Sequence, residues 1–181
     1  MRFTRLDLPE IILVQTDKLH DVRGHFARLF CADAFAAHGL PVHFPQCSLS
    51  FNVRRGTIRG LHWQDEPYPE GKLVRCIQGA VLDVAVDIRA NSPTNGRFVS
   101  FILEAETADA LYIPPGFAHG FQTLQDETTL LYQMTEPYRA DLARGLRCND
   151  PAIAIPWPLP NPILSDRDAN LPLFPCRRGP G

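Results

Sequence analysis

Short apolar segments separated by turn residues run along most of the chain. Within them hydrophobic and polar side chains tend to alternate, which is the period of a β-strand that buries one face. Such segments, punctuated by 17 prolines and 12 glycines, are typical of an antiparallel sandwich or barrel. The predicted strands are Ile11 to Thr16, Gln46 to Asn52, Thr57 to Gln64, Leu73 to Ile77, Val81 to Ile88, Phe98 to Leu103, Ala110 to Ile113, His119 to Leu124 and Thr128 to Thr135.

Helical patterns are scarce. One short helix is predicted from Ala32 to His38, and Gly39 follows it in the position of a left-handed C-cap. The turn dipeptides Gln78-Gly79 and Asn95-Gly96 separate neighbouring apolar runs, and Pro114-Pro115-Gly116 breaks the chain again. We therefore expect an all-β fold with few short helices.

The length of 181 residues fits a single domain, residues 1–181, that buries roughly two thirds of its unfolded surface. A proline-rich segment, Pro151 to Pro162, is expected to wrap around the barrel in extended form. The last residues, 175–181, are expected to form a disordered tail.

Composition narrows the class of protein. A formal net charge of -2 with 21% charged residues argues against nucleic acid as a partner. The only apolar run near the N-terminus, Ile11 to Val14, is too short for a signal sequence, and no run approaches a membrane span. Five cysteines without Cys-x-x-Cys spacing fit reduced thiols. We expect a soluble, cytoplasmic protein.

The histidines at the predicted barrel mouth suggest a metal site that lacks most of its ligands. A mononuclear site in a small β-barrel usually needs a His-x-His pair, a carboxylate and a later His. Here His62 is followed by Gln64, and the next histidine is His119. An amide is a poor ligand for zinc or iron, so we expect no bound metal. An imidazole without a metal can move protons instead.

Strand alternation from Thr57 to Gln64 places Arg59 and His62 on opposite faces. If both side chains reach one pocket, Gly60 must form a bulge. His62 is then either a general base in the barrel mouth or a hydrogen-bonded core histidine. Position alone favours the core histidine, and only a partner group would favour the base.

Three further side chains could complete a proton-transfer site. Asp168 could orient His62 through its second ring nitrogen, although a solvated aspartate in a polar loop is the simpler interpretation. Lys72 opens a strand and could face a developing oxyanion, or it could be a surface lysine. Tyr132 could act as an acid across a cavity from His62, although a core tyrosine is the default.

Other residues could bind an anion or a hydroxyl group. His119 could hold a ligand with Asp83 as its orienting carboxylate, unless Asp83 only caps its own strand. Arg23 and Arg59 together could bind a diphosphate through their forked guanidinium groups, although exposed arginines without a specific role are commoner.

Six motifs follow one another along the chain: Arg59-Gly60-Leu61-His62-Trp63-Gln64, Gly71-Lys72-Leu73-Val74-Arg75, Asp83-Val84-Ala85-Val86-Asp87, Ser92-Pro93-Thr94, Ile113-Pro114-Pro115-Gly116-Phe117-Ala118-His119-Gly120-Phe121 and Leu164-Ser165-Asp166-Arg167-Asp168. In this order they resemble the dTDP-4-dehydrorhamnose 3,5-epimerase family, which has the cupin-type double-stranded β-helix (jelly roll) fold. The resemblance extends from about Arg5 to Phe174.

The resemblance implies a homodimeric epimerase of a nucleoside-diphosphate 4-keto-6-deoxy sugar that uses no metal or other cofactor. It implies that His62 is the base, Asp168 its partner, Tyr132 the acid on the opposite face and Lys72 the group near the C4 oxygen. Substrate contacts are implied for Arg23, Phe26, Gln46, Ser48, Arg59, His119, Tyr138 and Arg167.

The chain departs from the common family pattern at four positions. Ser48 replaces an Asn, Arg28 and Ala143 each replace a Glu, and Arg167 replaces a Lys. The nucleotide, the sugar and the number of inverted carbons are therefore open. A 3- or 5-monoepimerase and a non-catalytic nucleotide-sugar-binding cupin are the alternatives, while Gln64 disfavours a metal-dependent cupin enzyme.

Overall fold

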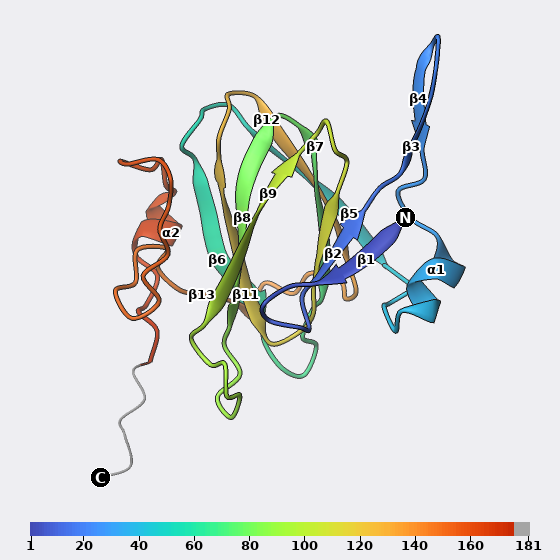
Figure 1. Ribbon diagram of the computed structural model, residues 1–181. Coiled ribbons are helices and arrows are strands. Elements are labelled where there is room, and N and C mark those ends of the chain that lie inside the picture. Colours follow the sequence, from blue (N-terminus) through green and yellow to red (C-terminus); the bar gives the residue numbers. More distant parts are fainter. Residues whose placement is uncertain (176–181) are drawn as a thin grey trace.

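The computed structural model describes residues 1–175 as two facing antiparallel sheets (Figure 1). The first sheet has the strand order β1-β2-β10-β7-β12-β5, and the second has the order β13-β6-β11-β8-β9. In the first sheet the strands are β1 (Arg2–Arg5), β2 (Ile12–Gln15), β10 (Ala110–Ile113), β7 (Lys72–Gln78), β12 (Thr128–Met134) and β5 (Gln46–Asn52). In the second they are β13 (Ala143–Gly145), β6 (Ile58–Gln64), β11 (Phe117–Thr123), β8 (Ala80–Asp87) and β9 (Phe98–Glu104).

All nine strands predicted from alternation are present, with ends shifted by at most two residues. The helix is also present as α1 (Ala32–Ala37), and Gly39 has the expected positive φ of 70°. The all-β prediction is therefore confirmed.

Several short elements were not predicted from the sequence. These are β1, β13, the hairpin of β3 (Lys18–Asp21) and β4 (Gly24–Ala27), and the helix α2 (Asp166–Ala169). Each has three or four residues, most of them exposed or half-buried, so each lacks the apolar run that marks the equally short strands β2 and β10. The predicted tail, 175–181, lies outside the described residues except for its first residue.

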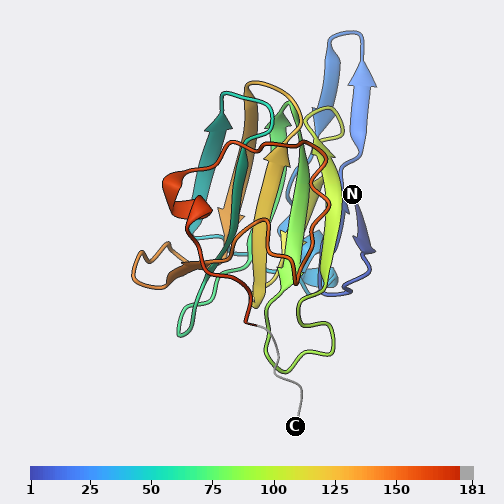
Figure 2. The same cartoon turned by 90° about the vertical axis from the view of Figure 1, so that its left-hand side faces the viewer.

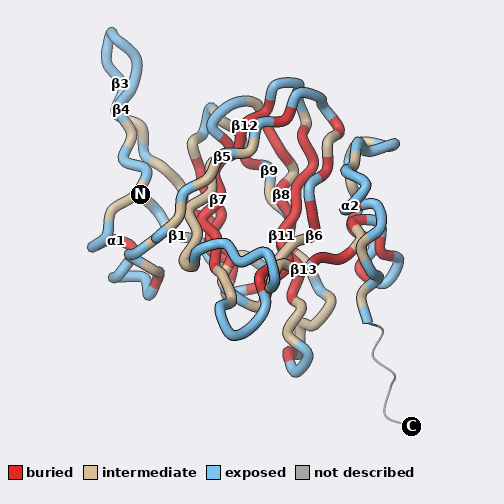
Figure 3. Tube along the Cα trace, turned by 180° about the vertical axis from the view of Figure 1, so that it is seen from behind, coloured by how far each residue is buried: buried red, intermediate tan, exposed pale blue. Residues whose placement is uncertain are grey.

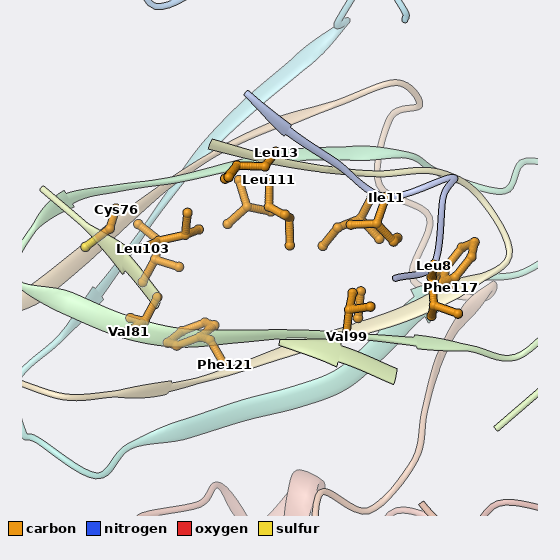
Figure 4. Close-up of a cluster of buried hydrophobic side chains, with 14 residues drawn as sticks. Leu8, Ile11, Leu13, Cys76, Val81, Val99, Leu103, Leu111, Phe117 and Phe121 are labelled. Atoms are coloured by element: carbon orange, nitrogen blue, oxygen red, sulfur yellow. The ribbon is translucent and has the colours of Figure 1, made fainter. Parts of the chain in front are cut away.

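Apolar side chains from the inner faces of both sheets fill the interior between them (Figure 4). Val74 and Leu111 come from the first sheet, Val81 and Phe121 come from the second, and all four are at most 1% exposed. This cluster stabilises the barrel because apolar burial favours folding by about 25 cal/mol per Å².

The chain after β13 crosses the outer face of the second sheet as a strap, defined as residues 146–175 (Figure 2). Trp157 and Ile155 of the strap pack with apolar residues on that outer face. Ile163 joins the strap to the start of β6, because its N–H donates to Gly56 and its carbonyl accepts from Ile58. The segment 151–162 wraps the barrel as expected, but it is not extended throughout, because residues 151–153 form a turn and Ala154 and Asn161 have positive φ. The strap then places α2 beside β6.

The hairpin β3–β4 projects away from the sheets and is exposed along its length (Figure 3). The chain that follows it is anchored by Arg75, which is 3% exposed and donates from Nη2 to the Leu29 carbonyl at 2.9 Å. Burial lowers the pKa of Arg75 to about 10. No helix in the part of the chain that the structure describes is long and apolar enough to cross a membrane.

Candidate active site

A pocket of about 400 Å³ opens between the two sheets at one end of the barrel. Strands β6 and β11 of the second sheet, β7 and β12 of the first, and α2 of the strap all contribute to its wall. The sequence-predicted residues that line it are His62, Lys72, Tyr132, Asp168, Ser48, Arg59, His119, Tyr138 and Arg167.

His62 and Asp168 form a hydrogen-bonded pair in this pocket. The His62 Nε2 atom lies 2.7 Å from Asp168 Oδ1, and Asp168 is 5% exposed. Asp168 is held in turn by the Gly60 N–H, 3.3 Å from its Oδ2, and by Ser165 Oγ, which caps α2 by accepting from the Asp168 N–H at 3.1 Å. The strap therefore brings Asp168 to His62, a partner that the strand pattern around His62 could not reveal.

Burial lowers the pKa of His62 below its ordinary value, and the Asp168 carboxylate opposes this effect only in part. The imidazole is therefore neutral near pH 7. With Nε2–H donating to the carboxylate, Nδ1 carries the free lone pair. A neutral histidine whose tautomer is fixed in this way can act as a general base.

A bulge in β6 brings Arg59 and His62 to the same pocket. On β11 the partners of His62 and Arg59 are His119 and Phe121, so three steps along β6 match two along β11. Gly60 has φ +126°, and a Cβ there would lie 2.6 Å from the Gly120 Cα. The predicted bulge at Gly60 is confirmed, and only glycine fits at this contact.

Lys72 faces the pocket from β7 as one half of an ion pair. Its Nζ lies 2.9 Å from Glu70 Oε1, and the two side chains are 10% and 9% exposed. Nζ also donates to the His62 carbonyl at 3.2 Å. Since an ammonium group has three protons, one remains for a ligand oxygen.

Tyr132 lies on β12, in the wall opposite His62. Its ring packs edge-on against His119, with 5.9 Å between the ring centroids. His119 Nε2 in turn donates to Asp83 Oδ2 at 2.8 Å. Burial first, and the Asp83 charge second, raise the pKa of Tyr132 well above its ordinary value. The phenol is therefore protonated near pH 7 and can donate a proton or a hydrogen bond.

Gln64, which stands where a metal-binding cupin would have its second histidine, has both amide atoms engaged. Its Nε2 donates to the Tyr68 carbonyl at 2.6 Å and the Pro137 carbonyl at 3.2 Å. Its Oε1 accepts from the Arg139 N–H at 2.7 Å. Gln64 thus links the loop that carries Tyr68 to the loop that carries Pro137 and Arg139, and we call these three hydrogen bonds the bracket. Among the described residues, no three His, Cys, Asp or Glu side chains group as metal ligands do.

Three of the residues implied as substrate contacts do not line the pocket. Arg23 and Phe26 lie on the projecting hairpin, where Arg23 pairs with Asp21 at 2.6 Å and Phe26 is 69% exposed. The hairpin stands off the barrel, so one chain cannot bring these two residues to its own pocket. Gln46 uses both ends of its amide within the protein: its Nε2 donates to Ser48 Oγ at 3.3 Å, and its Oε1 accepts from the Tyr138 N–H at 2.8 Å.

The structure adds pocket residues that sequence reasoning missed, chiefly Glu70, Trp63, Arg144 and Ser165. Glu70 could have been found, because an acidic residue two positions before Lys72 projects to the same side of an extended chain. Ser165 could have been found as the N-cap of a short helix, since Ser-x-x-Asp is a capping pattern. The sequence carries no comparable signal for Arg144.

Comparison with known proteins decides the family. A family model described as dTDP-4-dehydrorhamnose 3,5-epimerase matches residues 5–175. The chain belongs to this family. The dTDP-4-dehydrorhamnose 3,5-epimerase of Sinorhizobium fredii is 44% identical to the chain, over 95% of this chain and 89% of that protein. A dTDP-4-dehydrorhamnose 3-epimerase of Streptomyces niveus is 37% identical, over 100% of this chain and 87% of the relative.

A solved structure supports the same assignment. The dTDP-4-dehydrorhamnose 3,5-epimerase of Bacillus anthracis, with TDP and pyrophosphate bound, superimposes with a TM-score of 0.92 at 39% identity. The match covers 95% of this chain and 98% of that one. The family and the jelly-roll fold predicted from the sequence are therefore confirmed, and the predicted class of enzyme, an epimerase of dTDP-linked deoxysugars, is the class of these relatives.

Proposed function

We propose that the protein inverts C3 and C5 of dTDP-4-dehydro-6-deoxyglucose, giving dTDP-4-dehydro-L-rhamnose. The observation that carries the proposal is that a neutral, Asp168-paired His62 and a protonated Tyr132 line one pocket from opposite sheets. Inverting a carbon requires a base on one of its faces and an acid on the other, and this pocket supplies both.

The reaction begins with loss of a proton from the carbon beside the C4 ketone. His62 takes that proton, and the C–H electron pair moves into the ketone, leaving negative charge on the C4 oxygen. Lys72 stabilises this oxyanion with its remaining proton, and a positioned donor of this kind contributes about 3 to 4 kcal/mol. Tyr132 then gives a proton to the opposite face of the carbon, and the ketone re-forms with inverted configuration.

The diphosphate and nucleoside lie toward the pocket mouth in this proposal. Arg167 lines the pocket, and its guanidinium has no hydrogen bond or ion pair within the described residues, so it is free to bind phosphate. Arg59 also lines the pocket, but its Nε donates to Asn52 Oδ1 at 2.8 Å. Tyr138 is 54% exposed at the mouth, where an aromatic ring can stack on a base.

Incubation with dTDP-4-dehydro-6-deoxyglucose in D₂O tests the proposal. Deuterium should enter both C3 and C5, because each inversion exchanges the carbon-bound proton with solvent. No deuterium at either carbon would contradict the proposed activity, and binding without exchange would favour a nucleotide-sugar-binding protein.

A monoepimerase is the second candidate, because one of the full-length relatives is a 3-epimerase. Counting deuterons separates the two candidates, since a monoepimerase exchanges mainly one position.

We further propose that the protein is a homodimer. The outer face of the first sheet carries exposed apolar side chains at its β5 edge, where Phe51 is 48% and Val53 is 60% exposed. The hairpin adds Leu19 at 70% exposure. A long edge strand with an apolar face is a surface that native proteins cover. In such a dimer the projecting hairpin can carry Arg23 and Phe26 to the partner's pocket. The cytoplasmic location stays a prediction.

A further inference from the structure

The loop between β12 and β13, residues 135–142, forms one side of the pocket mouth. It carries Tyr138, which lines the pocket, and Arg139, whose guanidinium lies 3.8 Å from the centre of the Tyr68 ring. We call this segment the mouth loop. Its position sets how wide the entrance is and where the ring of Tyr138 lies.

Two glutamines hold consecutive amides of the mouth loop. Gln64, on β6 of the second sheet, accepts from the Arg139 N–H at 2.7 Å and donates to the Pro137 carbonyl at 3.2 Å. Gln46, on β5 of the first sheet, accepts from the Tyr138 N–H at 2.8 Å. The loop is therefore fixed from both sheets, one on each side of the barrel mouth.

Gln64 carries more of this fixation than Gln46. It is 3% exposed, and it also donates to the Tyr68 carbonyl at 2.6 Å. It thus ties the two loops whose side chains, Tyr68 and Arg139, stack on one another. Removing this buried amide would leave the Tyr68 and Pro137 carbonyls and the Arg139 N–H without their partner. The backbone of both loops would then be less firmly held.

We propose that Gln64 is a positioning residue that shapes the nucleotide end of the pocket by holding the mouth loop. The inference rests on the proposed function, because it assigns the mouth to the nucleoside diphosphate. His62 lies only two positions away on β6, but it is oriented independently by Asp168 from the strap. Loss of the bracket should therefore weaken nucleotide binding and leave the proton-transfer groups in place.

The test compares Gln64→Met with Gln122→Met in the full-length protein. Methionine has a similar length but neither donates nor accepts as an amide does. Gln122 is a matched control, because it brackets Leu159 of the strap in the same way, donating to its carbonyl at 2.9 Å and accepting from its N–H at 2.9 Å. Gln122 does not line the pocket, whereas Gln64 does, so the control tests the loss of a buried amide pair and not the loss of a pocket wall.

We expect Gln64→Met to raise KM about tenfold and to weaken dTDP binding by a similar factor, with kcat changed by less than about threefold. Gln122→Met should lower the melting temperature comparably without changing KM. Gln64→Glu keeps an acceptor for the Arg139 N–H but places a carboxylate against the Tyr68 and Pro137 carbonyls, so it should weaken dTDP binding at least as much as Gln64→Met.

An unchanged KM and dTDP affinity in Gln64→Met would overturn the inference, as would equal changes of KM in both methionine variants. A fall in kcat alone would also overturn it, because Gln64 would then act on the proton-transfer groups. If wild type lacks turnover, the proposed function fails, and dTDP affinity alone still tests the bracket.

Discussion

At the scale of single residues, two opposing effects set the protonation of His62. Burial disfavours the imidazolium, and the Asp168 carboxylate favours it, with burial prevailing. Tyr132 is shifted the other way, because burial disfavours the phenolate. The base is therefore kept free of its proton and the acid keeps its own at the same pH, which is the arrangement that a two-sided proton transfer needs.

The pH dependence follows from these directions. Activity should rise as the pH passes upward through the lowered pKa of His62, with a midpoint below 6.5, because the base works only when unprotonated. No alkaline loss from Tyr132 is expected up to about pH 10. A profile of kcat/KM against pH measures both the acidic rise and the absence of an alkaline fall.

Replacing Asp168 with Asn should lower the maximal activity and move the midpoint of the acidic rise to lower pH, because the Asp168 carboxylate raises the pKa of His62. The same profile measures this variant, and a midpoint that moved upward would contradict the assigned pairing.

Replacing Tyr132 with Phe should separate the two halves of the reaction. The ring is retained, so substrate binding should change little, while loss of the acid should slow inversion by about 10²- to 10⁴-fold. Product formation at saturating substrate measures the loss, and equilibrium binding of dTDP is the control. A near-normal rate would show that another group delivers the proton.

At the scale of elements, the bulge in β6 determines which side chains reach the pocket. Regular alternation would send Arg59 and His62 to opposite faces, and the close contact between Gly60 and Gly120 makes the difference. Sequence reasoning could state that Gly60 must form a bulge if Arg59 and His62 share a pocket, because strand alternation is a local pattern. It could not show that the bulge forms, since that depends on β11, nearly 60 positions later in the chain.

Gly60→Ala should therefore destabilise the fold and impair turnover together. The positive φ disfavours alanine by about 1–3 kcal/mol, and the contact of 2.6 Å with Gly120 Cα adds an overpacking term of about 1–3 kcal/mol. Gly56→Ala is the matched control, with φ +84° but nothing within 4 Å of the added Cβ. Thermal or denaturant unfolding measures both variants, and equal losses would mean that the contact is unimportant.

Short elements show the limit of prediction from one sequence. Nine strands were recognisable from their own apolar pattern, whereas α2 is a single turn of four residues that matters because the strap places it beside β6. Sequence reasoning could name Asp168 as a possible partner of His62, but it could not show that the two residues meet, because 106 positions separate them. The pairing of Glu70 with Lys72, by contrast, was within reach of local reasoning.

At the scale of the whole molecule, the projecting hairpin and the apolar β5 edge are the basis of the proposed homodimer. Phe51→Glu should shift a dimer toward monomer, because it places a charge in the proposed interface. Ile102→Glu is the control, since Ile102 is similarly exposed at 49% but lies on β9 of the other sheet. Sedimentation velocity measures both variants. A wild-type protein that sediments as a monomer would contradict the proposal.

The strap also supplies the barrel with one group for recognition, Arg167, and one for reaction, Asp168. The barrel holds the imidazole, the phenol and the ammonium group, while the carboxylate that orients the imidazole arrives from outside, on a segment with exposed prolines. A protease that nicked the strap near residues 158–162 and released its far end would remove both the carboxylate that orients the base and Arg167, the guanidinium proposed to bind phosphate. Such a clipped molecule would lose turnover and would also bind the sugar nucleotide more weakly.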